Sequence, residues 1–148
     1  MVARMLYGAP VLLQDWDTEE TAASARYWEL FLDLLLVAAA SATADGLKDN
    51  PTMAGVAEFC VIYYCFINSW LLYTHHITTR FEDGTLLHTL NFFVYLLGFA
   101  QCIINAGYDT AIQFSRGAIL QRLAVLIMLV NIYVFIPRAR QFCTLLVL

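Results

Sequence analysis

Four hydrophobic runs that almost lack charge constrain the fold of this chain more than any other feature. Their length is close to, or above, the roughly 20 residues that a helix needs to cross a bilayer. Backbone groups in lipid must be hydrogen-bonded within their own segment, so such a run folds as a helix. The expected spans are residues 27–44, 53–79, 86–106 and 118–136. We therefore expect an all-α integral membrane protein with about four transmembrane helices.

The overall composition agrees with a membrane protein. Of the 148 residues, 61% are hydrophobic and 14% are charged, whereas a soluble domain carries about 25% charged residues. A soluble chain of this length could not bury so much apolar surface. The net charge of −4 gives no basic footprint for nucleic acid. The expected partners are therefore the lipid bilayer and other membrane proteins.

Polar and helix-breaking residues separate the spans. They gather at 45–51, at 80–84 and at 107–117, and such residues favour turns in water. Pro137 is expected to end the fourth span, because its ring is incompatible with a helix interior. The second span is longer than the bilayer is thick, so we expect it to tilt or protrude.

The first 25 residues differ from the rest of the chain. Their apolar stretch is broken by Gly8 and Pro10 and is followed by acids, a pattern unlike that of a signal peptide. We expect residues 1–25 to form an acidic, exposed arm and residues 26–148 to form the transmembrane helical domain.

Basic residues favour one orientation of the four spans. Four spans place both termini and the 80–85 turn on the same side of the membrane. The basic residues expected on that side are Arg4, Arg26, Arg80, Arg138 and Arg140, and those on or near the other side are Lys48, Arg116 and Arg122. Since cytoplasmic loops carry an excess of Lys and Arg, the distribution favours N-in and C-in.

Acidic and basic side chains are expected to meet inside the membrane between the first two spans. Glu29 and Asp33 are four residues apart and share one helix face, while His75, His76 and Arg80 lie at the matching depth of the second span. A carboxylate in lipid usually has a partner. The cluster is interpreted as an ion-paired lock between helices, with a proton or ion relay as the alternative. A metal site is disfavoured, because adjacent histidines point about 100° apart on a helix.

Two further polar features lie deeper in the chain. Glu58 and Arg122 are expected to form a second pair, or Glu58 is a snorkelled surface acid. Polar and small residues also form stripes on the third span (Asn91, Tyr95, Gly98, Gln101 or Cys102, Asn105) and on the fourth (Gln121, Ala124, Met128, Asn131). These stripes are typical of helix–helix contacts in lipid; a polar pathway between helices is the alternative.

The sequence gives no positive indication of an enzyme. It contains no Ser/His/Asp arrangement, phosphate-binding Gly loop or dinucleotide fingerprint, and its four cysteines are interpreted as small packing residues. Lipid is the expected bound component. A pigment whose magnesium is held by His75, His76, His88 or Asn91 is a further hypothesis.

Two segments resemble a known family. Residues 27–37 read YWELFLDLLLV, and Trp70 and Tyr73 are followed by TTRFED at 78–83. In order and spacing, these segments look like the opening motifs of the bacterial low temperature requirement A (LtrA) family. The resemblance implies a polytopic membrane fold and carries Glu29, Asp33, Arg80 and Asp83 over as motif positions.

The resemblance is partial. It covers about the first third of a typical family member, Thr79 stands where the family commonly has Asn, and His88 also departs from the pattern. We expect an LtrA-like accessory or scaffolding subunit of a larger membrane complex. The alternatives are a small proton- or ion-coupled transporter that uses Glu29, Asp33, His76 and Arg80, and a pigment- or lipid-binding membrane subunit.

Overall fold

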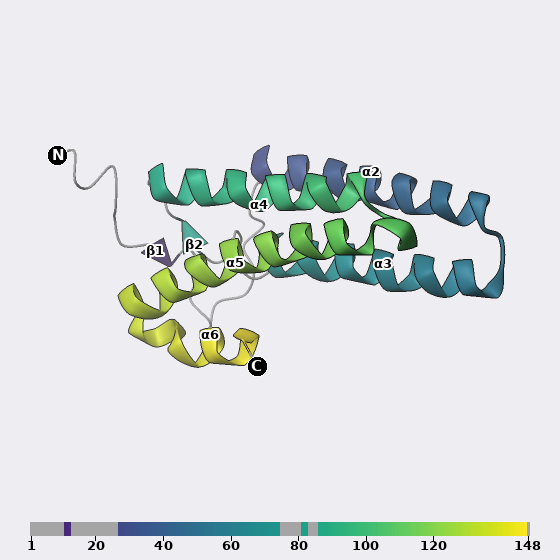
Figure 1. Cartoon of the computed structure of the whole chain (residues 1–148). Helices are drawn as coiled ribbons and strands as arrows, with labels where there is room; N and C mark the ends of the chain where they lie inside the picture. The colour runs from purple at the N-terminus through teal and green to yellow at the C-terminus, as the bar shows by residue number, and fades with distance from the viewer. Residues whose placement is uncertain (1–10, 13–26, 75–80, 83–85, 148) are drawn as a thin grey trace.

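Long helices dominate the computed structural model, which describes residues 11–12, 27–74, 81–82 and 86–147 (Figure 1). The helices are α2 (Tyr27–Asp49), α3 (Met53–Tyr73), α4 (Leu86–Ile104), α5 (Ala111–Phe135) and α6 (Arg140–Val147). The 3-10 turns η2 (Tyr108–Thr110) and η3 (Pro137–Ala139) precede α5 and α6. The four long helices lie side by side along one axis, and the short α6 folds back beside α5 (Figure 1).

The outer surface of this bundle is suited to lipid. Four helices are long and apolar enough to cross a membrane: Leu30–Asp49, Met53–Tyr73, Leu86–Ile104 and Ala111–Phe135. Large apolar side chains point outward from them, among them Leu34, Leu97 and Ile127. Exposed apolar surface on this scale is unfavourable in water and marks contact with a membrane or a partner. The predicted all-α, multi-pass membrane fold is confirmed.

Two helix ends differ from the predicted spans by more than two residues, and the end of a third reaches the edge of the described residues. α2 continues to Asp49 rather than ending at 44, because Gly46 is tolerated within the helix and Lys48 bridges to Asp45 at 2.6 Å one turn earlier. α5 begins at Ala111 rather than at 118. α3 ends at Tyr73, and the predicted continuation through 75–79 lies outside the described residues.

The turn between α2 and α3 is defined by one cap and one glycine. The Thr52 hydroxyl accepts a hydrogen bond from the backbone N–H of Gly55 at 3.2 Å, which satisfies a free donor at the start of α3. A Cβ on Gly55 would overlap the carbonyl oxygen of Asn50. Only glycine therefore fits this tight turn, and the turn sets α2 and α3 as an antiparallel hairpin.

The α4–α5 hairpin is packed most closely. A Cβ on Gly98 would lie 2.8 Å from the carbonyl oxygen of Gly117, and a Cβ on Gly117 would lie 2.8 Å from that of Gly98. The two glycines therefore allow the backbones of α4 and α5 to approach each other, as small residues do between helices in lipid. Buried aromatic rings join α3 to this hairpin: Tyr73 stacks on Tyr95 with ring centroids 4.3 Å apart.

A short strand pair and α6 complete the described chain. β1 (Val11–Leu12) pairs antiparallel with β2 (Phe81–Glu82), with Val11 opposite Glu82. These two residues of the predicted N-terminal arm are thus tied to the connection after α3; the rest of the arm lies outside the described residues. α6 buries Cys143, and the Arg140 guanidinium lies 5.4 Å from the Tyr133 ring centroid.

Candidate functional site

Of the predicted polar cluster, one side chain, that of Asp33, lies within the described residues. Asp33 lies in α2 and is exposed on the outer surface of the bundle. The indole N–H of Trp70 in α3 donates a hydrogen bond to the Asp33 carboxylate at 2.8 Å. A carboxylate in a span requires such a donor, so this contact ties the two helices together.

The other members of the cluster remain predictions. Glu29 belongs to α2, but its side chain lies outside the described residues. The same holds for His75, His76, Arg80 and Asp83. The pairing of Glu29 or Asp33 with these side chains is therefore untested, and the Trp70 partner of Asp33 was missed. The signal was present, because both residues belong to the motifs that resemble the LtrA family.

The predicted pair of Glu58 and Arg122 is not brought together. In the part of the chain that the structure describes, the two side chains form no ion pair; the ion pair found there joins Lys48 and Asp45. The physical reason is register. Because α5 begins at Ala111, Arg122 lies about three turns into its helix rather than one. Glu58 lies only about one and a half turns into α3.

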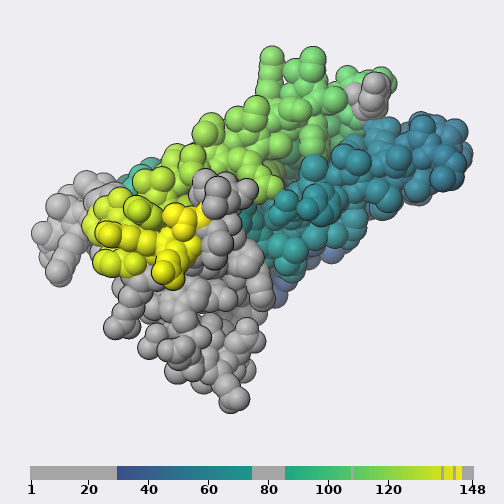
Figure 2. Space-filling view, turned by 90° about the horizontal axis from the view of Figure 1, so that it is seen from below, coloured from purple at the N-terminus to yellow at the C-terminus, as the bar shows by residue number. Residues whose placement is uncertain are grey.

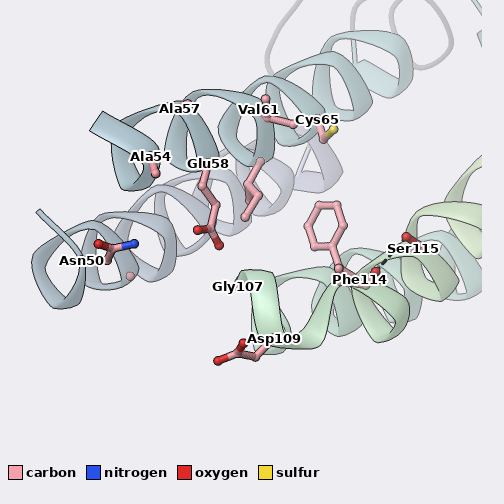
Figure 3. Close-up of a pocket in the computed structure, with 13 residues that line it drawn as sticks. Asn50, Ala54, Ala57, Glu58, Val61, Cys65, Gly107, Asp109, Phe114 and Ser115 are labelled. Atoms are coloured by element: carbon pink, nitrogen blue, oxygen red, sulfur yellow. Dashed lines mark hydrogen bonds between the residues drawn. The ribbon is translucent and has the colours of Figure 1, made fainter. Parts of the chain in front are cut away.

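Glu58 instead lines a cavity between α3 and the start of α5 (Figure 3). This space, called here the Glu58 cavity, has a volume of about 820 Å³. It lies at the end of the bundle where the α2–α3 and α4–α5 connections meet. Its described lining is Gly46, Asn50, Ala54, Ala57, Glu58, Val61, Ile62, Cys65, Gly107, Asp109, Ala111, Phe114 and Ser115.

The Glu58 carboxylate points into this cavity. Figure 3 shows it reaching from α3 towards α5, with the Phe114 ring on the opposite wall and Asp109 turned outward at the rim. Glu58 is half-buried and has no hydrogen-bond or ion-pair partner among the described residues. Phe114 also contacts the buried Phe66 ring edge-on, with centroids 5.7 Å apart, which joins this wall to the core. The Ser115 hydroxyl donates to the Ala111 carbonyl at 2.8 Å.

The polar stripes of α4 and α5 face each other, as the sequence predicted. The buried Asn91 amide donates to the Ala124 carbonyl at 2.8 Å. Farther along, the Gln121 amide donates to the Cys102 sulfur at 3.6 Å, and the Cys102 thiol donates to the Phe114 carbonyl at 3.4 Å. These groups hold one helix against the other, so the helix-contact interpretation is confirmed for them.

A second surface feature runs along the outside of α3. Six exposed residues repeat at alternating spacings of three and four: Ala54, Ala57, Val61, Tyr64, Asn68 and Leu71. This α3 seam has the heptad spacing with which helices pack against one another. In Figure 2 the outer surface of α3 is uncovered over most of its length, beside α5. The Asn68 amide lies in the seam, exposed and without a hydrogen-bond partner in the described chain.

The described residues offer the Glu58 cavity and the α3 seam as sites, but no cluster of three metal-ligating side chains. Comparison of the chain with protein-family models, with curated proteins and with solved structures found no match.

Proposed function

We propose that this protein is an LtrA-like accessory or scaffolding subunit that assembles with other membrane proteins through the α3 seam. The observation that carries this proposal is the exposed Asn68 amide within a span. A carboxamide has two donor hydrogens and one acceptor oxygen, and lipid tails satisfy neither. A partner helix that presents a polar group at the same depth would satisfy both.

The spacing of the seam supports a helix as the partner. Small residues occupy its first positions, Ala54 and Ala57, where a second backbone can approach closely. Tyr64 and Leu71 provide larger apolar surface on either side of Asn68. A single polar residue in a heptad seam fixes the register and number of associating helices. The seam therefore resembles half of a specific helix–helix interface.

The uneven burial of the helices points the same way. In α4 and in α5, 33% of the apolar 18-residue stretch is buried inside the chain, against 17% in α2 and in α3. The α4–α5 hairpin thus satisfies more of its own packing than the α2–α3 hairpin does. The less buried hairpin, α2–α3, carries the exposed α3 seam. Its exposed apolar surface is therefore available to contact a partner.

The contact between Asp33 and Trp70 supports the LtrA-like part of the proposal. The two motifs that carry the resemblance, one in α2 and one in α3, meet through this hydrogen bond of 2.8 Å. Residues distant in sequence but joined in space form one local unit. Two motifs that a family shares would be expected to form a local unit of this kind.

A second candidate function is favoured by one observation, the Glu58 cavity. An ionisable side chain within a span is typical of substrate and ion pathways, so the second candidate is a small proton- or ion-coupled transporter. The transporter expected from the sequence alone would use the cluster around Asp33, whereas this candidate uses Glu58.

Native-size analysis in mild detergent tests the assembly proposal, with mass spectrometry of the proteins that comigrate. We expect wild-type protein to run as a complex and the Asn68→Leu variant to run at the size of one chain. Ser41→Leu is the matched control, because Ser41 is also an exposed polar residue within a span, on α2. The proposal fails if the wild type runs as a monomer in native extracts, or if Asn68→Leu and wild type run at the same size.

A further inference from the structure

The size and walls of the Glu58 cavity suit a small organic molecule. Its volume of about 820 Å³ falls within the roughly 300–1,000 Å³ of known small-molecule sites. Most of its wall is apolar, and Phe114, Val61 and Ile62 are among the lining residues. This is the wall that an apolar ligand body requires.

The charged residues of the cavity wall favour a positively charged ligand. Glu58 and Asp109 contribute two carboxylates, whereas the described lining contains no Lys, Arg or His. Glu58 points inward without a partner among the described residues, and an unpaired carboxylate away from water is unfavourable. A cation beside Glu58 removes that cost, whereas an anion would add to it. A ligand that binds here would therefore carry its positive charge near Glu58.

A bare metal ion fits this site poorly. Calcium requires six to eight oxygen ligands and magnesium a tight octahedron. Glu58 offers one carboxylate inside the cavity, and Asp109 is turned outward at the rim (Figure 3). The remaining space is bounded mainly by carbon atoms. A cation that brings its own apolar body fills this space, and its charge still reaches Glu58.

One wall of the cavity is formed by exposed residues of α3. Ala54, Ala57 and Val61 line the cavity and are also exposed on the outer surface of α3, so the cavity is open laterally. Glu58 lies about 8 Å along α3 from its first residue, near one end of the candidate span Met53–Tyr73. We propose that the Glu58 cavity binds an amphipathic organic cation, with the charge on Glu58 and the apolar body against Phe114 and Val61. This inference does not depend on the assembly proposed above.

Equilibrium dialysis of radiolabelled tetraphenylphosphonium tests the proposal, using single copies of the full chain in phosphatidylcholine nanodiscs. We expect saturable binding to the wild type and at least about tenfold weaker binding to Glu58→Gln, because it removes one partner of a partly buried charge pair. Asp45→Asn is the matched control. It removes an acid at the same end of the bundle, but Asp45 is exposed, pairs with Lys48 and does not line the cavity. Its affinity should stay within about twofold of the wild type, because Asp45 makes no contact that binding would use.

A second variant tests the cavity without changing the charge. Cys65→Phe places a ring in the cavity from α3 and leaves Glu58 intact, so binding should be lost while circular dichroism stays helical. Dodecylamine should displace the bound cation, and dodecanol at equal concentration should not. Asn68→Leu should bind like the wild type, because Asn68 is not part of the lining.

Three results would overturn the site. They are no saturable binding to the wild type, equal affinity of Glu58→Gln and Asp45→Asn, and unchanged binding in folded Cys65→Phe. Displacement by dodecanol as strong as by dodecylamine would refute the role of charge. Loss of binding in Asn68→Leu would refute a site formed by the cavity of a single chain.

Discussion

The close approach of α4 and α5 depends on Gly98, and replacing it with alanine should destabilise the bundle. A Cβ on Gly98 would lie 2.8 Å from the carbonyl oxygen of Gly117, 2.9 Å from Cγ of Gln121 and 3.0 Å from its backbone nitrogen. Two of these three atoms belong to the backbone and cannot move aside by changing a rotamer. The helices must therefore separate along their tightest contact.

The magnitude follows from two opposing effects. Overpacking of a well-packed contact costs up to about 3 kcal/mol, and alanine gains about 1 kcal/mol over glycine in helix propensity. The net expectation for Gly98→Ala is a loss of about 2 kcal/mol, which is roughly a 30-fold shift of the folding equilibrium. Gly117→Ala should act through the same contact, so the double variant should lose less than the sum of the two.

Gly46→Ala is the matched control for this substitution. Gly46 also lies inside a helix, but the nearest atom to its added Cβ is the Ala106 carbonyl oxygen at 3.8 Å, an ordinary contact. This variant keeps the propensity gain without overpacking, so it should be unchanged or up to about 1 kcal/mol more stable. Reversible unfolding by dodecyl sulfate in mixed micelles measures the free energy of unfolding for each variant. Equal free energies for Gly98→Ala and Gly46→Ala would refute the close-approach argument.

Three further substitutions or reactions have defined expectations. Trp70→Phe removes the donor to Asp33 and should cost about 1 kcal/mol of unfolding free energy; a double-mutant cycle with Asp33→Ala, which removes the acceptor, measures the coupling, and a value of zero would contradict the contact. Gly55→Ala forces the α2–α3 turn to open and should cost more than about 2 kcal/mol, measured by the same unfolding assay. Burial raises the pKa of the Cys143 thiol, so less reactive thiolate is present at a given pH. In a form that keeps Cys143 as its one cysteine, maleimide labelling should be slow in the folded protein and faster after unfolding in dodecyl sulfate.

The spans were predictable because hydrophobic length alone decides which segments cross a bilayer. The facing stripes on α4 and α5 were predictable for a related reason. Asn91 and Gln121 each belong to a set with helical spacing, and lipid gives polar side chains no partner except another helix. In these cases a local pattern in the sequence is sufficient to determine the contact.

Features that depend on helix register were not predictable. The Asp45 and Gly46 pair reads as a turn, yet the helix continues because the stop comes only at Asn50 and Pro51. The early start of α5 moves Arg122 away from Glu58 and leaves that carboxylate to a cavity instead. The cavity itself arises from the space between two hairpins, and no single segment of the sequence encodes that space.

The α3 seam and the Glu58 cavity share Ala54, Ala57 and Val61, so the two proposals are physically linked. A partner helix on the seam would cover the lateral opening of the cavity and exclude lipid and water from it. A cation beside Glu58 would then interact more strongly, because the effective dielectric constant falls.

Linkage requires the converse effect: the bound cation must stabilise the assembly by the same factor, which for typical coupled sites is about 5- to 150-fold. Titrating tetraphenylphosphonium into a mixture in which half of the wild-type chain is assembled with its membrane partners should therefore raise the assembled fraction. The same titration of Glu58→Gln should leave that fraction unchanged, although its seam is intact. If saturating cation leaves the wild-type fraction unchanged as well, the partner does not cover the cavity, and the two sites act independently despite the residues they share.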